Sequence, residues 1–174
     1  MKISTLKAVT HILCEPTEII SKLPSTFKTL PHNYFYHPTV ALWHQKSYKQ
    51  STFKLEDKKY DTNSGVLVRS KSELIIANIL EEFGVLYQYQ PEYVINGKKI
   101  YPDFVVRKTF TGETIIWEHF GALSKENYEA GMNQKMQAYF ARGLLQFESI
   151  IYTFEFDLTR TRIEKLIKDL IISY

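Results

Sequence analysis

Two acidic residues, Asp103 and Glu118, each stand inside an apolar run of the sequence. Asp103 precedes Phe-Val-Val, and Glu118 follows Ile-Ile-Trp. Burying an ionised carboxylate among apolar side chains costs several kcal/mol, roughly, unless a cation or hydrogen-bond donors compensate. Two such carboxylates facing each other indicate a bound metal, and oxygen ligands favour Mg²⁺ or Mn²⁺ over zinc. These two acids are therefore the first candidates for chemistry.

The spacing between the two acids predicts that they face each other. If residues 109–112 form a four-residue hairpin loop, Lys108 pairs with Glu113, and counting outward places Asp103 opposite Glu118. Opposed residues of an antiparallel pair share a face of the sheet. A loop one residue longer or shorter would move one acid to the other face.

A helix is predicted over residues 70–83, and it brings a third acid. Ser70 and Glu73 have the spacing of a capping box, and Gly84 can end the helix. Glu73 also lies on the apolar stripe of this helix. It is either the partner of Ser70 in the cap or an acid that points toward Asp103 and Glu118.

A second helix is predicted from the cap residue Ser124 to about Arg142. Lys135 shares its apolar face with tyrosine and methionine side chains. Either the Lys135 stem carries the ammonium out to solvent, or the ammonium is needed inside.

The order of the remaining elements predicts an α/β fold. A strand interrupted by Pro91 is expected over residues 85–93, followed by a hairpin turn at Asn96-Gly97. Strands over residues 100–108 and 114–120 complete a meander, and a further strand is expected over 147–154. A last amphipathic helix starts at Thr159. Helices before, between and after these strands predict an α/β sandwich.

Residues 1–65 read as an irregular extension that is rich in lysine and aromatic residues. Trp43 and Tyr48 alternate with Lys46 and Lys49. Such interleaving suits stacking on bases with neutralisation of phosphates, or simply packing of the extension onto the core.

The composition is that of a globular protein, with a formal net charge of +3. No apolar stretch has the length of a membrane span, and no signal-peptide core follows Met1. Cys14 is the only cysteine, which fits a reducing compartment. We expect a soluble, cytoplasmic protein.

An ordered set of short motifs resembles the PD-(D/E)xK nuclease superfamily. The motifs are Val-Arg-Ser-Lys-Ser-Glu at 68–73, Tyr-Gln-Tyr-Gln at 87–90, Pro-Asp-Phe at 102–104 and Trp-Glu-His-Phe-Gly at 117–121, followed by Tyr128, Lys135 and Tyr139. More narrowly, they resemble an uncharacterised subgroup that sometimes occurs beside helicase or ATPase modules. The resemblance implies a restriction-endonuclease-like three-layer core over residues 66–174, in which helices flank a central mixed sheet, preceded by the extension of residues 1–65.

The resemblance also implies roles for individual residues. Asp103 and Glu118 would hold Mg²⁺ or Mn²⁺, with the carbonyl of His119 as a further ligand. Glu73 would assist, which favours the catalytic role over the cap. Residues expected to contact nucleic acid are Arg69, Lys71, Lys46, Lys49 and Tyr128.

One position departs from the superfamily's pattern. The motif lysine should stand two residues after Glu118, where this chain has Phe120. Similar enzymes supply the lysine from a neighbouring helix, and Lys135 is the natural candidate, with Lys71 as a further option. The His119 side chain would point to the opposite face of its strand, so it is a weaker substitute.

The sequence thus predicts a magnesium-dependent endonuclease that hydrolyses DNA. The alternatives are a non-catalytic nucleic-acid-binding or interaction module that kept the fold, and a structural subunit whose acids only pair with lysines. Expected partners are nucleic acid, a second copy of the chain, or a protein such as a helicase or ATPase.

Overall fold

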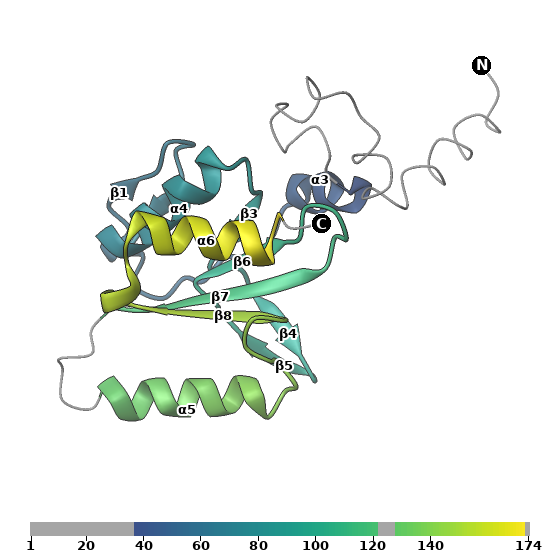
Figure 1. Ribbon diagram of the computed structural model, residues 1–174. Helices are drawn as coiled ribbons and strands as arrows, with labels where there is room; N and C mark the ends of the chain where they lie inside the picture. The colour runs from purple at the N-terminus through teal and green to yellow at the C-terminus, as the bar shows by residue number, and fades with distance from the viewer. Residues whose placement is uncertain (1–36, 122–127, 173–174) are drawn as a thin grey trace, which may run out of the picture.

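The computed structural model describes residues 37–121 and 128–172 (Figure 1). Its helices are α3 (Pro38–Gln45), α4 (Lys71–Glu82), α5 (Tyr128–Phe140) and α6 (Arg160–Leu170), with two 3₁₀ turns, η3 (Leu55–Asp57) and η4 (Glu155–Asp157). Its strands are β1 (Tyr60–Asp61), β2 (Leu67–Val68), β3 (Tyr87–Tyr89), β4 (Tyr93–Ile95), β5 (Lys98–Ile100), β6 (Phe104–Arg107), β7 (Thr114–Phe120) and β8 (Ile150–Phe154). Within these residues, no helix has both the length and the apolar character needed to cross a membrane.

The centre of the molecule is a mixed sheet of four strands in the order β3-β6-β7-β8. β3, β6 and β7 are antiparallel to their neighbours, whereas β8 lies parallel to β7 at the edge. A parallel partner requires a crossover, and the chain between β7 and β8 contains α5. The predicted mixed α/β fold, a meander plus one further strand, is confirmed.

The predicted register between β6 and β7 is also confirmed. Phe104 pairs with Trp117 and Val105 with Ile116, so one step further places Asp103 opposite Glu118. Gly112 closes the loop with a φ of +73°, a conformation that glycine adopts without strain. The local turn chemistry therefore fixes the relative position of the two acids.

Helices α4 and α6 cover one face of the sheet (Figure 1). The capping box predicted for α4 is present, and Thr159 caps α6 as expected. The core on this side contains Ile76 and Leu80 of α4, Ile163 and Ile167 of α6, and Trp117 of the sheet. Fully burying each of these side chains stabilises the fold by roughly 1.5–3 kcal/mol.

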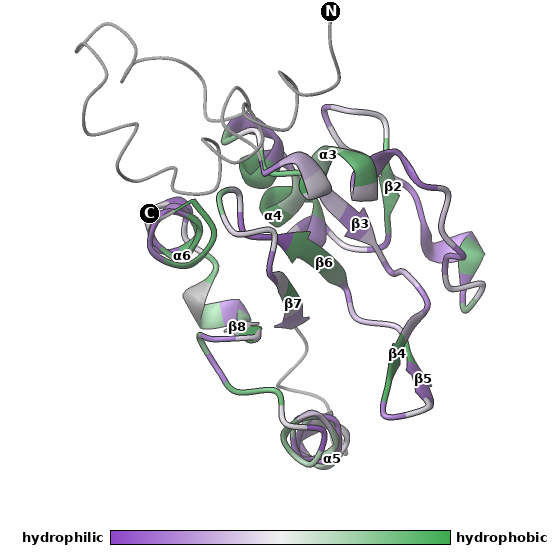
Figure 2. Ribbon diagram, turned by 90° about the vertical axis from the view of Figure 1, so that its right-hand side faces the viewer, coloured by the Kyte–Doolittle hydropathy of each residue, from purple (hydrophilic) through white to green (hydrophobic). Residues whose placement is uncertain are grey.

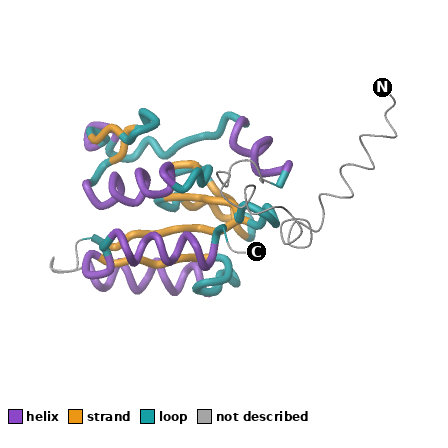
Figure 3. The backbone as a smooth tube through the Cα atoms, turned by 45° about the horizontal axis from the view of Figure 1, so that its top comes forward, coloured by secondary structure: helices purple, strands orange, loops and turns teal. Residues whose placement is uncertain are grey.

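Helix α5 covers the opposite face, as the views in Figures 1 and 2 agree. The apolar cluster there is smaller and contains Ile116 and Phe120 of β7 and Tyr139 of α5. Met132 and Met136 of α5 pack against it while staying partly exposed. In Figure 3 the sheet is seen with helices on both sides, so the described chain has a helix, sheet, helix layering.

The interruption predicted at Pro91 is present, although the strands have other bounds than expected. The strand expected over residues 85–93 divides into β3 and β4, because Gln90 has a φ of +48° and Pro91 has no N–H to donate. The strand expected over residues 100–108 likewise splits into β5 and β6, and β4 and β5 form a separate hairpin. The Gln90 N–H then bonds to the Asp103 carbonyl at 2.9 Å, next to the acid itself.

Part of the amino-terminal extension lies within the described residues. Helix α3 lies beside the β6–β7 loop, where the His37 N–H bonds to the Thr109 carbonyl at 2.7 Å. Residues further along hydrogen-bond to the strand region, for instance Ser51 N–H to the Gln90 carbonyl at 2.9 Å. The domain boundary predicted at residue 65 falls between the paired strands β1 and β2 and stays a prediction.

Candidate active site

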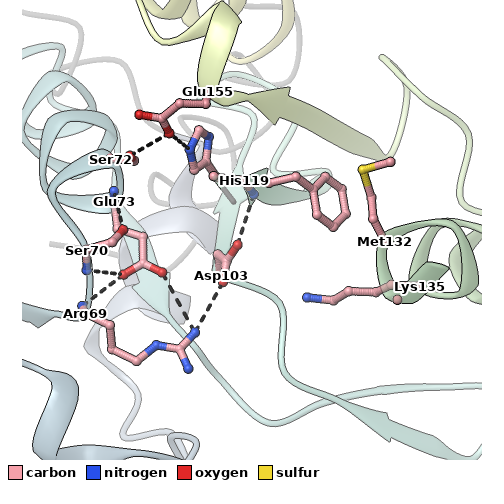
Figure 4. A pocket seen from close by; sticks show the side chains of 12 residues that line it. Arg69, Ser70, Ser72, Glu73, Asp103, His119, Met132, Lys135 and Glu155 are labelled. Carbon is pink, nitrogen blue, oxygen red and sulfur yellow. Dashed lines mark hydrogen bonds and ion pairs between the residues drawn. The ribbon is translucent and has the colours of Figure 1, made fainter. Parts of the chain in front are cut away.

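A cavity of about 650 Å³ opens where β6 begins and β7 ends, between the N-terminus of α4 and helix α5 (Figure 4). This volume lies in the range of small-molecule sites. The residues that line it are Arg69, Ser70, Ser72, Glu73, Asp103, His119, Phe120, Gly121, Gly131, Met132, Lys135 and Glu155. Three of the four predicted catalytic residues, Glu73, Asp103 and Lys135, therefore line one cavity.

Asp103 is held by the end of the sheet. Its Oδ2 accepts a hydrogen bond from the backbone N–H of His119 at 2.9 Å, which ties the start of β6 to the end of β7. Its Oδ1 lies 3.7 Å from Nη2 of Arg69. The carboxylate is thus buried but charge-compensated, as a buried acid must be.

Glu118 is the most deeply buried acid, with 0% of its surface exposed. Its Oε2 accepts from Nζ of Lys135 at 2.5 Å, and its Oε1 accepts a short hydrogen bond from the Tyr139 hydroxyl. Burial and the nearby Asp103 raise the pKa of Glu118 to about 8, although Lys135 and Tyr139 act in the opposite direction. This carboxylate lies behind the cavity wall, and the Lys135 side chain lies at the wall itself.

The predicted relocation of the lysine has a clear geometric counterpart. Lys135 and Tyr139 are four residues apart on α5, so both side chains point at β7. Phe120, at the motif position, packs instead against Tyr152 and Phe154, with ring centroids 5.9 and 5.8 Å apart. An ammonium at position 120 would lie within that apolar cluster. Helix α5 instead brings the Lys135 ammonium to the Glu118 carboxylate.

Glu73 occupies the capping role that the sequence allowed. Its Oε2 accepts from the backbone N–H groups of Arg69 and Ser70 at 2.9 and 3.0 Å, and from the Tyr89 hydroxyl at 2.9 Å. Burial and Asp103 raise its pKa. Glu73 also lines the cavity, so the cap and a place in the site coexist in one conformation.

Arg69 connects the two acids nearest to α4. Its Nη2 lies 3.8 Å from Oε1 of Glu73 and 3.7 Å from Oδ1 of Asp103, as the dashed lines in Figure 4 mark. With the Gln90 amide turned so that its oxygen faces Arg69, this oxygen accepts from Nε at 2.7 Å. The guanidinium is thereby fixed at the cavity wall.

The His119 side chain points to the other face of the sheet, as predicted. Its Nδ1 lies 3.1 Å from Oγ1 of Thr153, and its Nε2 lies 3.3 Å from Oε2 of Glu155. Ser72 of α4 donates to the same Glu155 oxygen at 3.1 Å. Glu155 of η4 therefore joins α4, through Ser72, to β7, through His119, at the rim of the cavity.

The residues predicted to bind nucleic acid divide into two groups. Arg69 lines the cavity, whereas Lys46, Lys49 and Lys71 are exposed and do not line it. Lys49 lies 3.5 Å from Glu92. The Tyr128 side chain lies outside the described part of the structure.

The donor set suits a hard divalent cation. Asp103 and Glu118 face each other, and a cation between them would relieve the repulsion that contributes to the raised pKa of Glu118. Within residues 37–121 and 128–172 there is no group of three or more His, Cys, Asp and Glu side chains arranged for a metal. Mg²⁺ commonly takes one or two carboxylates and completes its shell with water, so two acids and a carbonyl suffice. To bind it, Glu118 would have to share the oxygen that Lys135 now holds.

Several contacts of the site were not predicted. Tyr139 belongs to the motifs of the resemblance, but the sequence gives no sign that its hydroxyl bonds to Glu118 directly. Gln90 also belongs to a motif, and its polar side chain at the end of a buried strand is the signal that could have indicated its place in the site. Glu155, exposed in a 3₁₀ turn, gives no comparable signal in the sequence.

Comparison with known proteins gives a match to part of the chain. No protein-family model matches the chain, and no solved structure matches it. The chain is similar to the uncharacterized protein MJ1519 of Methanocaldococcus jannaschii, with 33% identity over 85 residues. The match covers 48% of this chain and 7% of that protein, so the chain resembles a small part of a much longer protein.

Proposed function

We propose that the protein is a divalent-metal-dependent nuclease of the PD-(D/E)xK superfamily that hydrolyses phosphodiester bonds of DNA as an endonuclease. The observation that carries the proposal is the contact of 2.5 Å between Nζ of Lys135 and Oε2 of Glu118, opposite Asp103. Through this contact a lysine lies beside the acid pair, even though the motif position holds Phe120. The layered mixed sheet and the cavity at the ends of β6 and β7 support the same assignment, including the restriction-endonuclease-like fold.

The metal would be held by Asp103 and Glu118, with the His119 carbonyl as a third ligand. Mg²⁺ or Mn²⁺ bound there would polarise the scissile phosphate and lower the pKa of an attacking water. The other residues act around it. The Lys135 ammonium stabilises negative charge that develops on the phosphate in the transition state, while Tyr139 keeps the Glu118 carboxylate in place.

Arg69 is the natural phosphate ligand at the other wall. Its guanidinium fork can hold two phosphate oxygens, and Glu73 and Asp103 fix its direction. Glu73 thus assists as a positioning residue. Lys46, Lys49, Lys71 and Tyr128 would contact the nucleic-acid backbone farther from the reaction, without reading its sequence.

The test is cleavage of labelled single-stranded, duplex and branched DNA by the full chain in Mg²⁺ and in Mn²⁺. Asp103→Asn keeps an oxygen to accept from the His119 N–H but removes the charge, so we expect it to abolish cleavage while leaving the fold intact. Lys165→Met, at an exposed position of α6 beside Asp169, is the matched control and should cleave like the wild type. Absence of any metal-dependent cleavage by the wild type would contradict the proposal.

A second candidate is a nucleic-acid-binding or interaction module without turnover. It is favoured by one observation: both Glu118 oxygens already accept hydrogen bonds, so the acid is satisfied without a metal. DNA binding that depends on salt and survives Asp103→Asn, with no cleavage in either metal, would select this candidate.

The proposal extends to partners. A segment similar to this chain occurs in the much longer M. jannaschii protein. We therefore include a larger protein, such as a helicase or ATPase, as a partner, with a second copy of this chain as the other candidate. Cutting both strands of a duplex usually takes two active sites, and a second copy or a larger partner protein could bring the second site to the DNA. We place this activity in the cytoplasm.

A further inference from the structure

Three phenylalanine rings form a continuous stack from the cavity to the surface. Phe120 of β7 lines the cavity and stacks on Phe154 of the edge strand β8, with centroids 5.8 Å apart and planes at 27°. Phe154 stacks in turn on Phe156 of η4, with centroids 5.3 Å apart and planes at 2°. The stack thus begins at the wall beside Lys135 and ends beyond the edge of the sheet.

The last ring of the stack is exposed and yet held in place. Phe156 is 74% exposed, although its ring stacks on Phe154. Glu155, the residue before it, is anchored by Ser72 and His119 through its Oε2, at 3.1 and 3.3 Å. The 3₁₀ turn therefore holds the Phe156 ring against Phe154, directly after Glu155, which lines the cavity.

We propose that Phe156 is a stacking platform for an unpaired nucleobase of the strand whose phosphate lies in the cavity. The inference rests on the proposed nuclease function, and it names the substrate class: single-stranded DNA or a strand that leaves a duplex at a fork or flap. The charges agree with this occupant, because Lys135 and Arg69 at the cavity suit a phosphate and the neighbouring ring suits a base. Bases inside a duplex are already stacked on both sides, so intact duplex cannot use the platform.

The experiment measures binding apart from cleavage. Full-length Asp103→Asn protein in EDTA is titrated against fluorescent oligothymidylate and against a blunt-ended duplex of two annealed strands, with and without Phe156→Ala. We expect Phe156→Ala to weaken binding of the single strand about tenfold, which corresponds to about 1.4 kcal/mol, and to leave duplex binding unchanged. Phe156→Trp should retain tight binding, whereas Phe156→Leu should behave like Phe156→Ala.

Phe140 provides the matched control. It is 70% exposed on α5 and lies outside the stack formed by Phe120, Phe154 and Phe156, so Phe140→Ala should bind both probes like its parent. Equal binding of the single strand by the Phe156→Ala and parent proteins would overturn the inference, including the case in which Phe156 instead docks a protein. If the parent binds the single strand and the wild type cleaves DNA, that result leaves the proposed function standing. If the wild type neither binds nor cleaves any DNA, both fail together.

Discussion

The two faces of the sheet differ in what their burial accomplishes. The face under α4 and α6 is a large, closed apolar cluster in which Trp117 is fully buried. The face under α5 has a smaller cluster, and a fully buried carboxylate, Glu118, lies beside it with Lys135 and Tyr139. Burying a charge seldom adds stability, because desolvation offsets the gain from pairing. We infer that the first face stabilises the fold and that the second is kept for chemistry.

The largest expected effect comes from a substitution on the face under α4 and α6. Trp117→Ala removes a fully buried ring and its hydrogen bond from Nε1 to Thr153, which is 3.0 Å long. We expect a loss of about 3–5 kcal/mol in the free energy of unfolding. Urea denaturation followed by circular dichroism measures it, with Phe140→Ala as an exposed control that should change stability by no more than about 0.5 kcal/mol. A loss below about 1 kcal/mol would show that this face is not the main source of stability.

The second prediction separates chemistry from stability on the α5 face. Lys135→Met should lower cleavage about a hundredfold or more, because a charge next to the reacting phosphate is lost. Stability should fall by only about 1–2 kcal/mol, since Lys135 is 40% exposed and Glu118 can take up a proton. Single-turnover cleavage and urea denaturation on the same samples give both values. A variant that cleaves like the wild type would exclude Lys135 as the relocated lysine.

The pH dependence of stability should reveal Glu118. Burial and Asp103 raise its folded-state pKa to about 8, so the folded protein holds a proton that the unfolded chain releases near pH 4.5. The contribution of Glu118 to the free energy of unfolding is fully present below the pKa of the unfolded chain and is lost as pH rises toward 8. We expect the stability of Glu118→Gln relative to the wild type, measured in EDTA, to increase from pH 5 to pH 8. A constant difference would mean that Glu118 is ionised throughout this range.

The smallest effect concerns a polar contact on the α4 side. Glu81 accepts from Ser64 and from the Tyr87 hydroxyl at 2.6 Å; these bonds outweigh burial and lower its pKa. Glu81→Gln should cost about 1 kcal/mol at pH 7, a value reduced by solvent screening. Because the folded pKa is lowered, this contribution is present above the unfolded pKa and disappears as pH falls through the folded value. Thermal unfolding at pH 7 and pH 3 checks both parts, and an equal cost at the two values would contradict the assignment.

Neighbouring residues made much of the fold predictable. The loop ending in Gly112 sets the β6–β7 register, and Ser70 with Glu73 sets the start of α4, so both could be read from a few adjacent positions. Pro91 likewise predicted the interruption between β3 and β4. The positive φ of Gln90 could not be predicted, because this conformation of a non-glycine residue is stabilised by tertiary contacts such as its bond to Asp103.

The candidate site also has one part that the sequence predicts and one part that it does not. The register placed Asp103 opposite Glu118. Helical spacing placed Lys135 on an apolar face but left open whether its ammonium turns inward, and only the resemblance to the nuclease superfamily favoured the inward position. The bond from Tyr139 to Glu118 depends on how α5 packs across the sheet, and the Glu155 contacts join three elements distant in sequence. Contacts of this kind depend on how helices and strands pack together, which local sequence patterns do not encode.

The most direct test of the central claim is Mn²⁺ binding to the full chain, followed by the electron paramagnetic resonance signal of the free ion. We predict binding by the wild-type protein that is lost in Asp103→Asn and in Glu118→Gln and retained in the control Lys165→Met. Mn²⁺ binding that is absent from the wild type, or unchanged in both acid variants, would contradict the account.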